Sequence, residues 1–386
     1  MDFQLTDEQI ELRDSVRRYA VERLIPIAEE IESSGEPPTS ELVSEFAEMG
    51  YLGISISAEL GGQGLSNLEA LLVVEELGRV SSAVGFPVFE ANVGPVRAIE
   101  RFGDKALVES VVPAVCAGEK MVAIAMSEPQ AGTALTDLKS RATVANGEVV
   151  INGAKRWCSG GNHADGYLVY CRFTDEPGAK SIGAVYVESG TEGLSFGQPE
   201  HLMGFRGIPS SDIFLDQVRV PETNIVVGAG GFGKLMAAFD LERCGNATMA
   251  LAQASAALDD VTVYVQERHQ FGKPIVDFQA VQLKLAEMAM QVEASRLLIW
   301  KAAVDADQGF PSIRASSIAK CFANEIARSV TGDALQLMGG YGYSKEYPME
   351  RRFRDAWGWG IAGGAIDIQK VNIASAVVGR RFNQRS

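Results

Sequence analysis

The stretch ATVANGEVVI, residues 142–151, decides how the chain divides. Two runs suited to β-strands, Ala142–Val144 and Val149–Ile151, flank the pair Asn146-Gly147. An Asn-Gly pair between such runs is a strong signal for a β-hairpin, because both residues tolerate a positive φ. The hairpin predicts a β-domain in the middle of the chain. Further runs rich in Val, Ile and Tyr extend it, at 122–125, 167–173, 182–187 and 213–220, with an expected end near Pro221.

Helical patterns lie on both sides of this β-region. Thr6 is suited to cap a first helix, because two acids follow it in the turn where the helix macrodipole favours negative charge. Towards the C-terminus, apolar residues recur at helical spacing from Val281 to Ile299 and from Ile318 to Leu337, and the second segment stops at Gly339-Gly340. Long helices with one apolar face indicate a helical bundle.

The order of these patterns predicts an α+β multidomain fold. We expect an N-terminal α-helical domain over residues 1–118, a middle antiparallel β-domain over 119–228 and a C-terminal helical bundle over 229–386. The chain has 386 residues, of which 46% are hydrophobic, and this is enough to bury more than one core.

Composition excludes several classes of function. The net charge of −15 argues against a nucleic-acid partner, which requires a basic surface. The three histidines and five cysteines lack metal-ligand spacing, so no metal site is expected, and the cysteines are interpreted as free and mostly buried. Without a secretory signal or a long apolar stretch, the protein is expected to be cytoplasmic and without a membrane partner.

A glycine-rich run at 228–233, GAGGFG, formally matches the dinucleotide-binding pattern. That pattern binds phosphate between a strand and a helix of a βαβ unit, and no such unit surrounds it here. We therefore interpret the run as an interdomain hinge.

Four motifs together resemble the acyl-CoA dehydrogenase family, in the order and on the α or β texture that the family has. They are SEPQAGT (127–133), NGAKRWCS (152–159), ERHQFGKP (267–274) and DALQLMGGYG (333–342). The resemblance covers essentially the whole chain. It implies that the middle domain is a β-barrel and the C-terminal domain a four-helix bundle. It also implies a homotetramer, a dimer of dimers, with FAD bound between subunits.

The resemblance assigns the FAD site to two groups of residues. Ser127 and Ser159 would donate hydroxyl hydrogen bonds to the flavin, and Trp157 would pack over its ring; taken alone, Trp157 would be read as an ordinary core aromatic. Arg268 and Gln336 would bind the pyrophosphate from a neighbouring subunit. The remaining expected cofactor-binding residues are Met126, Gly132, Thr133, Gln270, Phe271, Gly339 and Gly340.

The catalytic base departs from the family's usual pattern. Most members carry a Glu near the C-terminus, and Gly363 stands at that position here. The run FDLER, 239–243, resembles the isovaleryl-CoA dehydrogenase branch, which carries its base on this earlier helix, so Glu242 is the expected base; a surface or salt-bridged Glu is the alternative. Burial should raise its pKa. The backbone N–H of Gly363 is expected to bind the enolate oxygen.

The expected reaction is removal of the α-proton by Glu242 with hydride transfer of the β-hydrogen to FAD, giving a 2-enoyl-CoA. Electrons would pass to an electron-transfer flavoprotein. Asp240 and Arg243 would hold the CoA portion. Thr133, Phe86, Ala362 and Gly364 are further expected substrate-binding residues, with Phe89 and Met126 near the acyl group.

The residues around Gly363 also bear on the acyl group. Ala362 and Gly363 are smaller than the family's usual Tyr and Glu, which favours a branched, cyclic or aryl acyl group. Some loops resemble 3-sulfinopropionyl-CoA desulfinase, but that enzyme has Gln in place of Glu242 and Arg in place of Phe86. A desulfinase or a decarboxylating dehydrogenase remains the alternative, and a non-catalytic flavoprotein or CoA-binding module is a third hypothesis.

Overall fold

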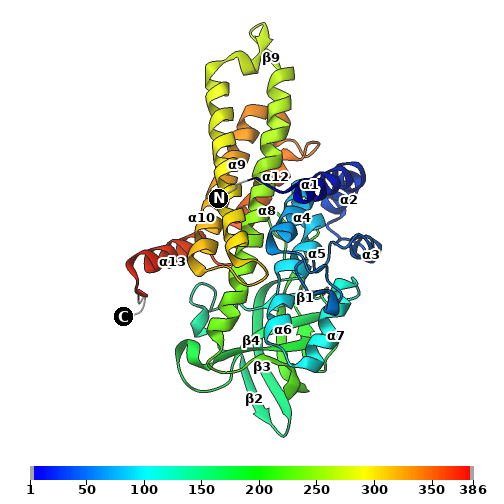
Figure 1. Ribbon diagram of the computed structural model, residues 1–386, viewed down its shortest axis with the longest axis vertical. Helices are drawn as coiled ribbons and strands as arrows, with labels where there is room; N and C mark the ends of the chain where they lie inside the picture. Colours follow the sequence, from blue (N-terminus) through cyan, green and yellow to red (C-terminus); the bar gives the residue numbers. More distant parts are fainter. Residues whose placement is uncertain (1–3, 383–386) are drawn as a thin grey trace.

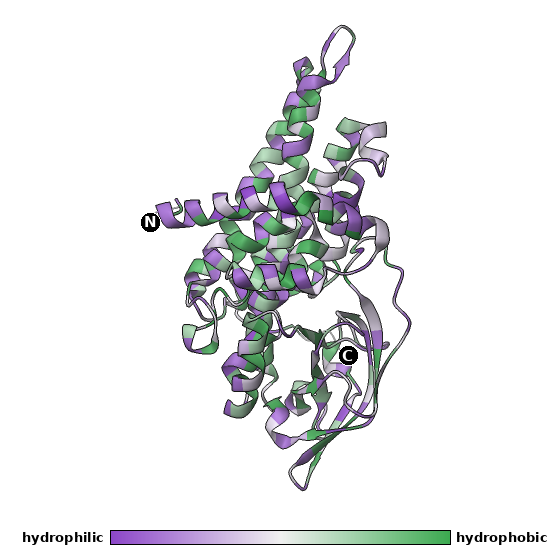
Figure 2. Ribbon diagram, turned by 90° about the vertical axis from the view of Figure 1, so that its right-hand side faces the viewer, coloured by the Kyte–Doolittle hydropathy of each residue, from purple (hydrophilic) through white to green (hydrophobic). Residues whose placement is uncertain are grey.

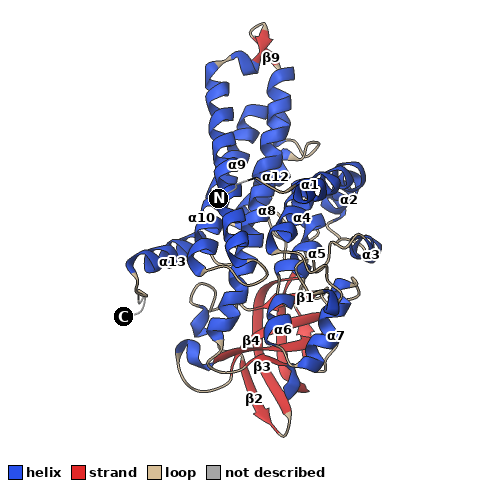
Figure 3. Ribbon diagram, in the orientation of Figure 1, coloured by secondary structure: helices blue, strands red, loops and turns tan. Residues whose placement is uncertain are grey.

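The computed structural model describes residues 4–382, and it has helices at both ends of the chain and a sheet between them (Figures 1 and 3). The N-terminal helices are α1 (Asp7–Tyr19), α2 (Ile25–Ser34), α3 (Ser40–Glu48), α4 (Asn67–Val80), α5 (Ser82–Val93), α6 (Val96–Phe102) and α7 (Lys105–Cys116). A π-helical turn at Ala20–Leu24 joins α1 to α2, just before Pro26. The predicted cap is confirmed, because the Thr6 side chain accepts from Gln9 N–H in a capping box.

The middle of the chain forms a β-sheet domain (Figure 3). Its strands are β1 (Val122–Ala125), β2 (Arg141–Ala145), β3 (Glu148–Ser159), β4 (Gly166–Arg172), β5 (Ile182–Glu188), β6 (Leu194–Phe196), β7 (Ser210–Pro221) and β8 (Ile225–Val227). The strand order is β6-β7-β3-β2-β4-β5-β8, and β1 pairs with β4. The predicted hairpin is confirmed, since β2 and β3 meet at Asn146 and Gly147, with φ of 54° and 80°.

Two details of this domain differ from the sequence prediction. The β1–β4 and β2–β4 pairs are parallel, so the sheet is not wholly antiparallel. The sheet also continues beyond Pro221, because β8 pairs with β5. Short strands such as β6 and β8 carry too few residues to show a period in the sequence.

The C-terminal helices form a bundle in which α8 packs against α9, α10 and α12. They are α8 (Phe232–Glu267), α9 (Gln279–Ala306), α10 (Ile313–Met338), α11 (Gly340–Tyr343), α12 (Met349–Trp359) and α13 (Ile366–Val378). Strands β9 (His269–Gln270) and β10 (Lys273–Pro274) make a small hairpin between α8 and α9, at the end of the bundle far from the sheet (Figure 1). Hydrophobic and hydrophilic residues are interspersed along these helices (Figure 2), and α8 is buried on nearly all sides between Ala238 and Ala257.

The predicted fold class, helical domain, β-sheet domain and helical domain, is confirmed. The predicted limits at 118/119 and 228/229 fall in the loops before β1 and before α8. All five cysteines are buried and free, as expected. No helix within residues 4–382 is long and apolar enough to cross a membrane.

Candidate active site

Glu242 lies on α8, the helix that packs against α4, α5 and α10. Burial raises the pKa of its carboxyl group to about 8, against the opposing effects of Lys320 and Arg243. Glu242 forms no ion pair among the described residues, so the salt-bridged alternative does not hold. A carboxyl group with this pKa exchanges its proton near neutral pH, as a general base requires.

Close packing of α8 on α5 fixes where Glu242 lies. A Cβ on Gly245 would come within 2.4 Å of Val93 and 2.9 Å of Phe89, both on α5, so only glycine permits this approach. Glu242 is one helical turn before Gly245. The side chain is therefore held at the junction of α8 with α5, where the helices cannot separate without opening the core.

The two residues beside Glu242 already have partners in the protein. Asp240 and Arg243 are buried and form an ion pair with each other, and the Ser316 hydroxyl donates to Asp240 at 2.6 Å. The Arg243 guanidinium also lies 5.2 Å from the Phe239 ring centroid. Its Nε is buried and has no hydrogen-bond partner within residues 4–382. Because this nitrogen has no exposed surface, it identifies no ligand contact by itself, and the CoA role of this pair stays a prediction.

The turn that carries Gly363 follows α12, and side chains from α8 and α10 form hydrogen bonds with it. Gly363 and Gly364 have φ of 64° and 90°, in the region that favours glycine. The carbonyl of Ala362 accepts from Lys320 Nζ at 2.7 Å and from Asn246 Nδ2 at 3.3 Å. We call Glu242, Asn246, Lys320 and Gly363 the catalytic junction.

Aromatic side chains pack between α5 and the end of α12. Phe86 and Phe89 stack with centroids 6.0 Å apart, and Phe89 lies 5.5 Å from Trp359. Trp359 is buried and donates to the Ser82 hydroxyl at 3.0 Å, which gives this residue a packing role that its sequence context did not reveal. Both phenylalanines are almost fully buried, so their contact with an acyl group stays a prediction.

Glu90 is a buried carboxyl group near the half-buried Glu242, and the sequence reasoning missed it. Burial, and then the charge of Glu242, raises its pKa well above the usual value. Its Oε2 has no hydrogen-bond partner in the described part of the chain. The residue follows Phe89 on a helix that is apolar on all sides, and a lone acid in such a helix was the available signal.

Trp157 stands out from the β-domain at an irregular place in β3. The pairing of β3 with β7 shifts register between Lys155 and Cys158, and Trp157 in this bulge has a φ of 61°. Its side chain is 53% exposed, so it is not a core aromatic. The Arg156 guanidinium lies 4.1 Å from its ring centroid, and Arg156 is itself paired with Asp212. A large exposed ring in a strained backbone fits a surface that binds a flat ligand such as flavin.

The loop after β1 lies beside this bulge. The N–H of Arg156 donates to the carbonyl of Ser127 at 2.9 Å, which brings Ser127 close to Trp157 and Ser159. Beneath the loop, Lys155 and Glu128 form a fully buried ion pair at 2.8 Å, and Lys155 also donates to the carbonyl of Met126. The loop end at Gly132 and Thr133 is exposed. The expected flavin-binding residues therefore share one surface of the β-domain.

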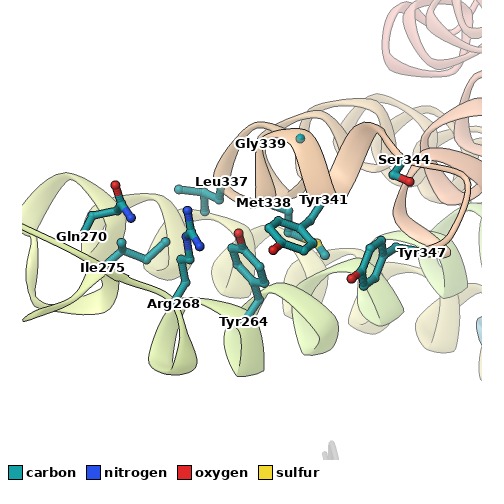
Figure 4. A pocket seen from close by; sticks show the side chains of 11 residues that line it. Tyr264, Arg268, Gln270, Ile275, Leu337, Met338, Gly339, Tyr341, Ser344 and Tyr347 are labelled. Carbon is teal, nitrogen blue, oxygen red and sulfur yellow. The ribbon is translucent and has the colours of Figure 1, made fainter.

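The second group of expected cofactor residues lies elsewhere, at the hairpin between α8 and α9. Arg268, Gln270, Gly339 and Gly340 line an open cavity of about 740 Å³ (Figure 4). The other lining residues are Tyr264, Ile275, Leu337, Met338, Tyr341, Ser344 and Tyr347. Gln336 is exposed nearby but does not line the cavity.

Phe271 is at the tip of this hairpin. It is 94% exposed and forms a two-residue turn with Gly272, both at positive φ. We call Arg268, Gln270, Phe271, Gly339 and Gly340 the hairpin end. In Figure 1 it lies at the opposite end of the bundle from the β-domain, so one chain does not bring the two groups of cofactor residues together.

The glycine-rich run lies between β8 and α8, and its expected role as an interdomain hinge stays a prediction. The glycine-rich run at 228–231 precedes α8 and, with Arg101 and Lys234, lines a cavity of about 590 Å³.

Lys320, a buried residue of the catalytic junction, was missed. It lies two residues from both Ile318 and Phe322 and therefore on the opposite side of the helix from that part of the predicted stripe, so the apolar spacing carried no signal for it.

Comparisons with known proteins agree with this arrangement. Models of the N-terminal, middle and C-terminal domains of acyl-CoA dehydrogenases match residues 6–119, 123–218 and 229–378. A 3-sulfinopropanoyl-CoA desulfinase of Paraburkholderia xenovorans is 37% identical, over 99% of this chain and 99% of its own length.

Two solved structures superpose closely. Butyryl-CoA dehydrogenase from Megasphaera elsdenii has a TM-score of 0.93 at 34% identity, over 98% of this chain and 100% of that chain. A glutaryl-CoA dehydrogenase bound to glutaryl-CoA has a TM-score of 0.94 at 32% identity, over 100% of this chain and 99% of that chain. With all three domains matched and relatives similar over their full length, the chain belongs to the acyl-CoA dehydrogenase family of FAD-dependent enzymes.

Proposed function

We propose that this enzyme removes the α-proton of a branched, cyclic or aryl acyl-CoA with Glu242 and so forms the 2-enoyl-CoA. The observation that carries the proposal is the carboxyl group of Glu242, with a pKa of about 8, at the junction of α5 and α8. Gly363, at the family's usual base position, has no side chain that could replace it. FAD, when bound, accepts the β-hydrogen as a hydride.

The chain's own residues have distinct tasks in this reaction. Glu242 takes the proton. Its pKa of about 8 is close to neutral pH, the range in which a general base is most effective. The Gly363 N–H donates to the thioester oxygen as negative charge develops there. Arg243 and Asp240 bind the CoA portion by hydrogen bond and ion pair. Ser127, Trp157 and Ser159 hold the flavin.

The charges near Glu242 favour an acyl group without an anionic end. Arg243 is paired with Asp240, and Lys320 already donates to Asn246 and two backbone carbonyls. Glu90 adds an acid to the same region. A sulfinate or carboxylate on the acyl chain would therefore meet acids without a free cation to bind it. Small side chains at Ala362 and Gly363 leave width for a branched or cyclic group.

A second copy of the chain completes the FAD site in this proposal. The hairpin end and the flavin surface lie at opposite ends of one chain (Figure 1), and FAD would bridge the hairpin end of one subunit and the β-domain of another. The nearly complete exposure of Phe271 is typical of a residue that a partner covers. We propose a homotetramer, with an electron-transfer flavoprotein as the electron acceptor.

Elimination of sulfite is the second candidate, because a 3-sulfinopropanoyl-CoA desulfinase is 37% identical to this chain. Phe86, where that resemblance requires Arg, and the presence of Glu242 favour dehydrogenation instead. A decarboxylating dehydrogenation would also need the missing cation.

One experiment separates these candidates. The holoenzyme is mixed anaerobically with isobutyryl-, cyclohexanecarbonyl-, 3-phenylpropionyl-, butyryl-, glutaryl- and 3-sulfinopropionyl-CoA, and flavin bleaching and sulfite release are measured. We expect bleaching by one of the first three and no sulfite release. Sulfite release without bleaching would identify a desulfinase, fastest bleaching by glutaryl-CoA a decarboxylating enzyme, and no bleaching with any of them would refute the proposal.

A further inference from the structure

Lys320 is a buried lysine that takes no direct part in the proposed reaction. It lies in the first third of α10 with no exposed surface, and it forms no ion pair among residues 4–382. Burying an ammonium group is costly unless hydrogen bonds compensate for the lost water. A lysine in this position therefore calls for a specific reason.

Three acceptors surround the Lys320 ammonium group. Asn246 Oδ1 and the carbonyl of Ala362 each lie 2.7 Å from Nζ, and the carbonyl of Trp359 lies 3.3 Å away. A protonated lysine has three N–H donors and a neutral one has only two, so this set of partners fits the charged form. Burial, followed by the charge of Arg243, lowers the pKa of Lys320 well below its usual value despite the opposing charge of Glu242, so the charged form depends on these three acceptors.

The surrounding amides keep these partners in place. Asn324 Nδ2 donates to Asn246 Oδ1 at 3.0 Å, so that oxygen accepts from two donors. Asn246 Nδ2 in turn donates to the carbonyl of Ala362. The Ala362 carbonyl thus receives one hydrogen bond from an ammonium group and one from an amide.

The carbonyl of Ala362 belongs to the same peptide group as the N–H of Gly363. In a trans peptide these two bonds point in opposite directions, so the N–H points away from Lys320. It takes part in no hydrogen bond within the described residues. Hydrogen bonds to a peptide carbonyl polarise the peptide and make its N–H a stronger donor, more so when the donor is charged.

We propose that Lys320 and Asn246 are positioning residues that orient and polarise the Ala362–Gly363 peptide, so that the Gly363 N–H binds the developing oxyanion more strongly than an ordinary amide would. This inference rests on the proposed function of Gly363. It also explains why a glycine at 363 suits the site. A Cβ there would lie 3.2 Å from Asn246 Nδ2 and 3.5 Å from Lys320 Nζ, against the groups that hold the peptide.

The test uses FAD-loaded enzyme and two substitutions. Lys320→Gln keeps an N–H donor but removes the charge, and Lys320→Met removes both. The probe is the 2-enoyl-CoA of whichever acyl-CoA bleaches the wild-type flavin fastest, for example cinnamoyl-CoA for 3-phenylpropionyl-CoA. The thioester carbonyl stretch of the bound probe is measured by difference Raman spectroscopy, because its downward shift from the free value reports the strength of the oxyanion donor.

We expect the carbonyl shift to be largest in wild type, smaller in Lys320→Gln and smallest in Lys320→Met, with FAD content unchanged. Flavin reduction should slow by about tenfold to a hundredfold in Lys320→Met, less than the loss of a whole oxyanion donor. Thr331→Val, a buried change on the same helix, is the control and should keep the wild-type shift.

Equal carbonyl shifts in wild type and Lys320→Gln would overturn the inference, even if the variant is less stable, since a merely structural lysine leaves the probe's carbonyl unaltered. If Lys320→Met does not fold, Lys320→Gln and Asn246→Leu decide the question by the same measurement. Failure of the wild-type enzyme to bleach would instead refute the proposed function, so the two failures are distinguishable.

Discussion

At the catalytic junction, Glu242 and Lys320 are enclosed between α8, α5 and α10, whereas at the hairpin end Arg268 and Phe271 stand on an exposed turn. Both enclosed groups have shifted pKa values, and Lys320 also has fixed hydrogen-bond partners, because low-dielectric surroundings penalise unpaired charge. The exposed groups line an open cavity and have room to accept a ligand. All four residues of the catalytic junction belong to one chain, whereas the hairpin end needs a second chain to form the proposed FAD site.

This contrast suggests a physical reason for carrying the base at position 242 instead of position 363. A base at 363 would extend from a turn, whereas Glu242 extends from a long helix already locked against α5 by Gly245. The turn keeps only its backbone, which Lys320 and Asn246 hold. In the proposed mechanism, the base is a side chain on the rigid helix, and the turn contributes only an N–H group.

The largest expected effect is at the junction. Glu242→Gln should bind FAD normally and reduce the rate of flavin reduction by at least about a thousandfold, because the amide cannot take the α-proton. Anaerobic stopped-flow bleaching measures it. Glu287→Gln, an exposed carboxyl on α9, is the matched control and should behave as wild type. Unimpaired bleaching by Glu242→Gln would remove Glu242 from the mechanism.

A substitution at the hairpin end should weaken FAD binding but leave the rate of flavin reduction unchanged. Arg268→Ala should weaken FAD binding by about tenfold to a hundredfold, the usual loss for a hydrogen bond to a charged group. The FAD that remains bound should be reduced at the wild-type rate. Equilibrium dialysis and stopped-flow measurements test the two statements, with Arg314→Ala as an exposed control. Undiminished FAD affinity would show that the hairpin end does not bind the cofactor.

Restoring the family's usual carboxyl group should not help this enzyme. Gly363→Glu places a side chain at a φ of 64° and against Asn246, which should cost about 1–3 kcal/mol of unfolding free energy. We expect a lower thermal midpoint and no faster bleaching than wild type. Ala365→Glu, two residues along the chain, controls for added charge. A faster Gly363→Glu enzyme would contradict the proposed wide acyl pocket.

The last prediction concerns how stability depends on pH. Because the pKa of Glu242 is about 8 in the folded protein and near 4.5 when unfolded, the unfolded state binds fewer protons between these values. Stability from this group therefore falls as pH rises from 4.5 to 8, and Glu242→Gln should relieve the loss. The thermal midpoint of the variant should exceed that of wild type at pH 7.5, and the difference should vanish near pH 4. A constant difference would mean that the carboxyl group is ionised when folded.

Local patterns predicted much of the fold. Asn146-Gly147 marked a real hairpin, Thr6 capped the first helix, and the stripe from Ile318 to Leu337 became α10, because each signal depends on residues a few positions apart. By contrast, β1 pairs in parallel with β4, and β8 pairs with β5. Both pairings join segments that are far apart in the sequence. No local pattern encodes them.

The sequence by itself determined the order of domains, the resemblance that assigns FAD, and the presence of Glu242 where Gly363 lacks a carboxyl group. Only the tertiary structure decided that Lys320 and Asn246 meet the Ala362 carbonyl, that Glu90 lies near Glu242, and that the two groups of cofactor residues lie apart in one chain. The physical reason is that hydrogen bonds and pKa shifts depend on distance and burial, and folding brings residues such as 246, 320 and 362 together across long separations in the chain.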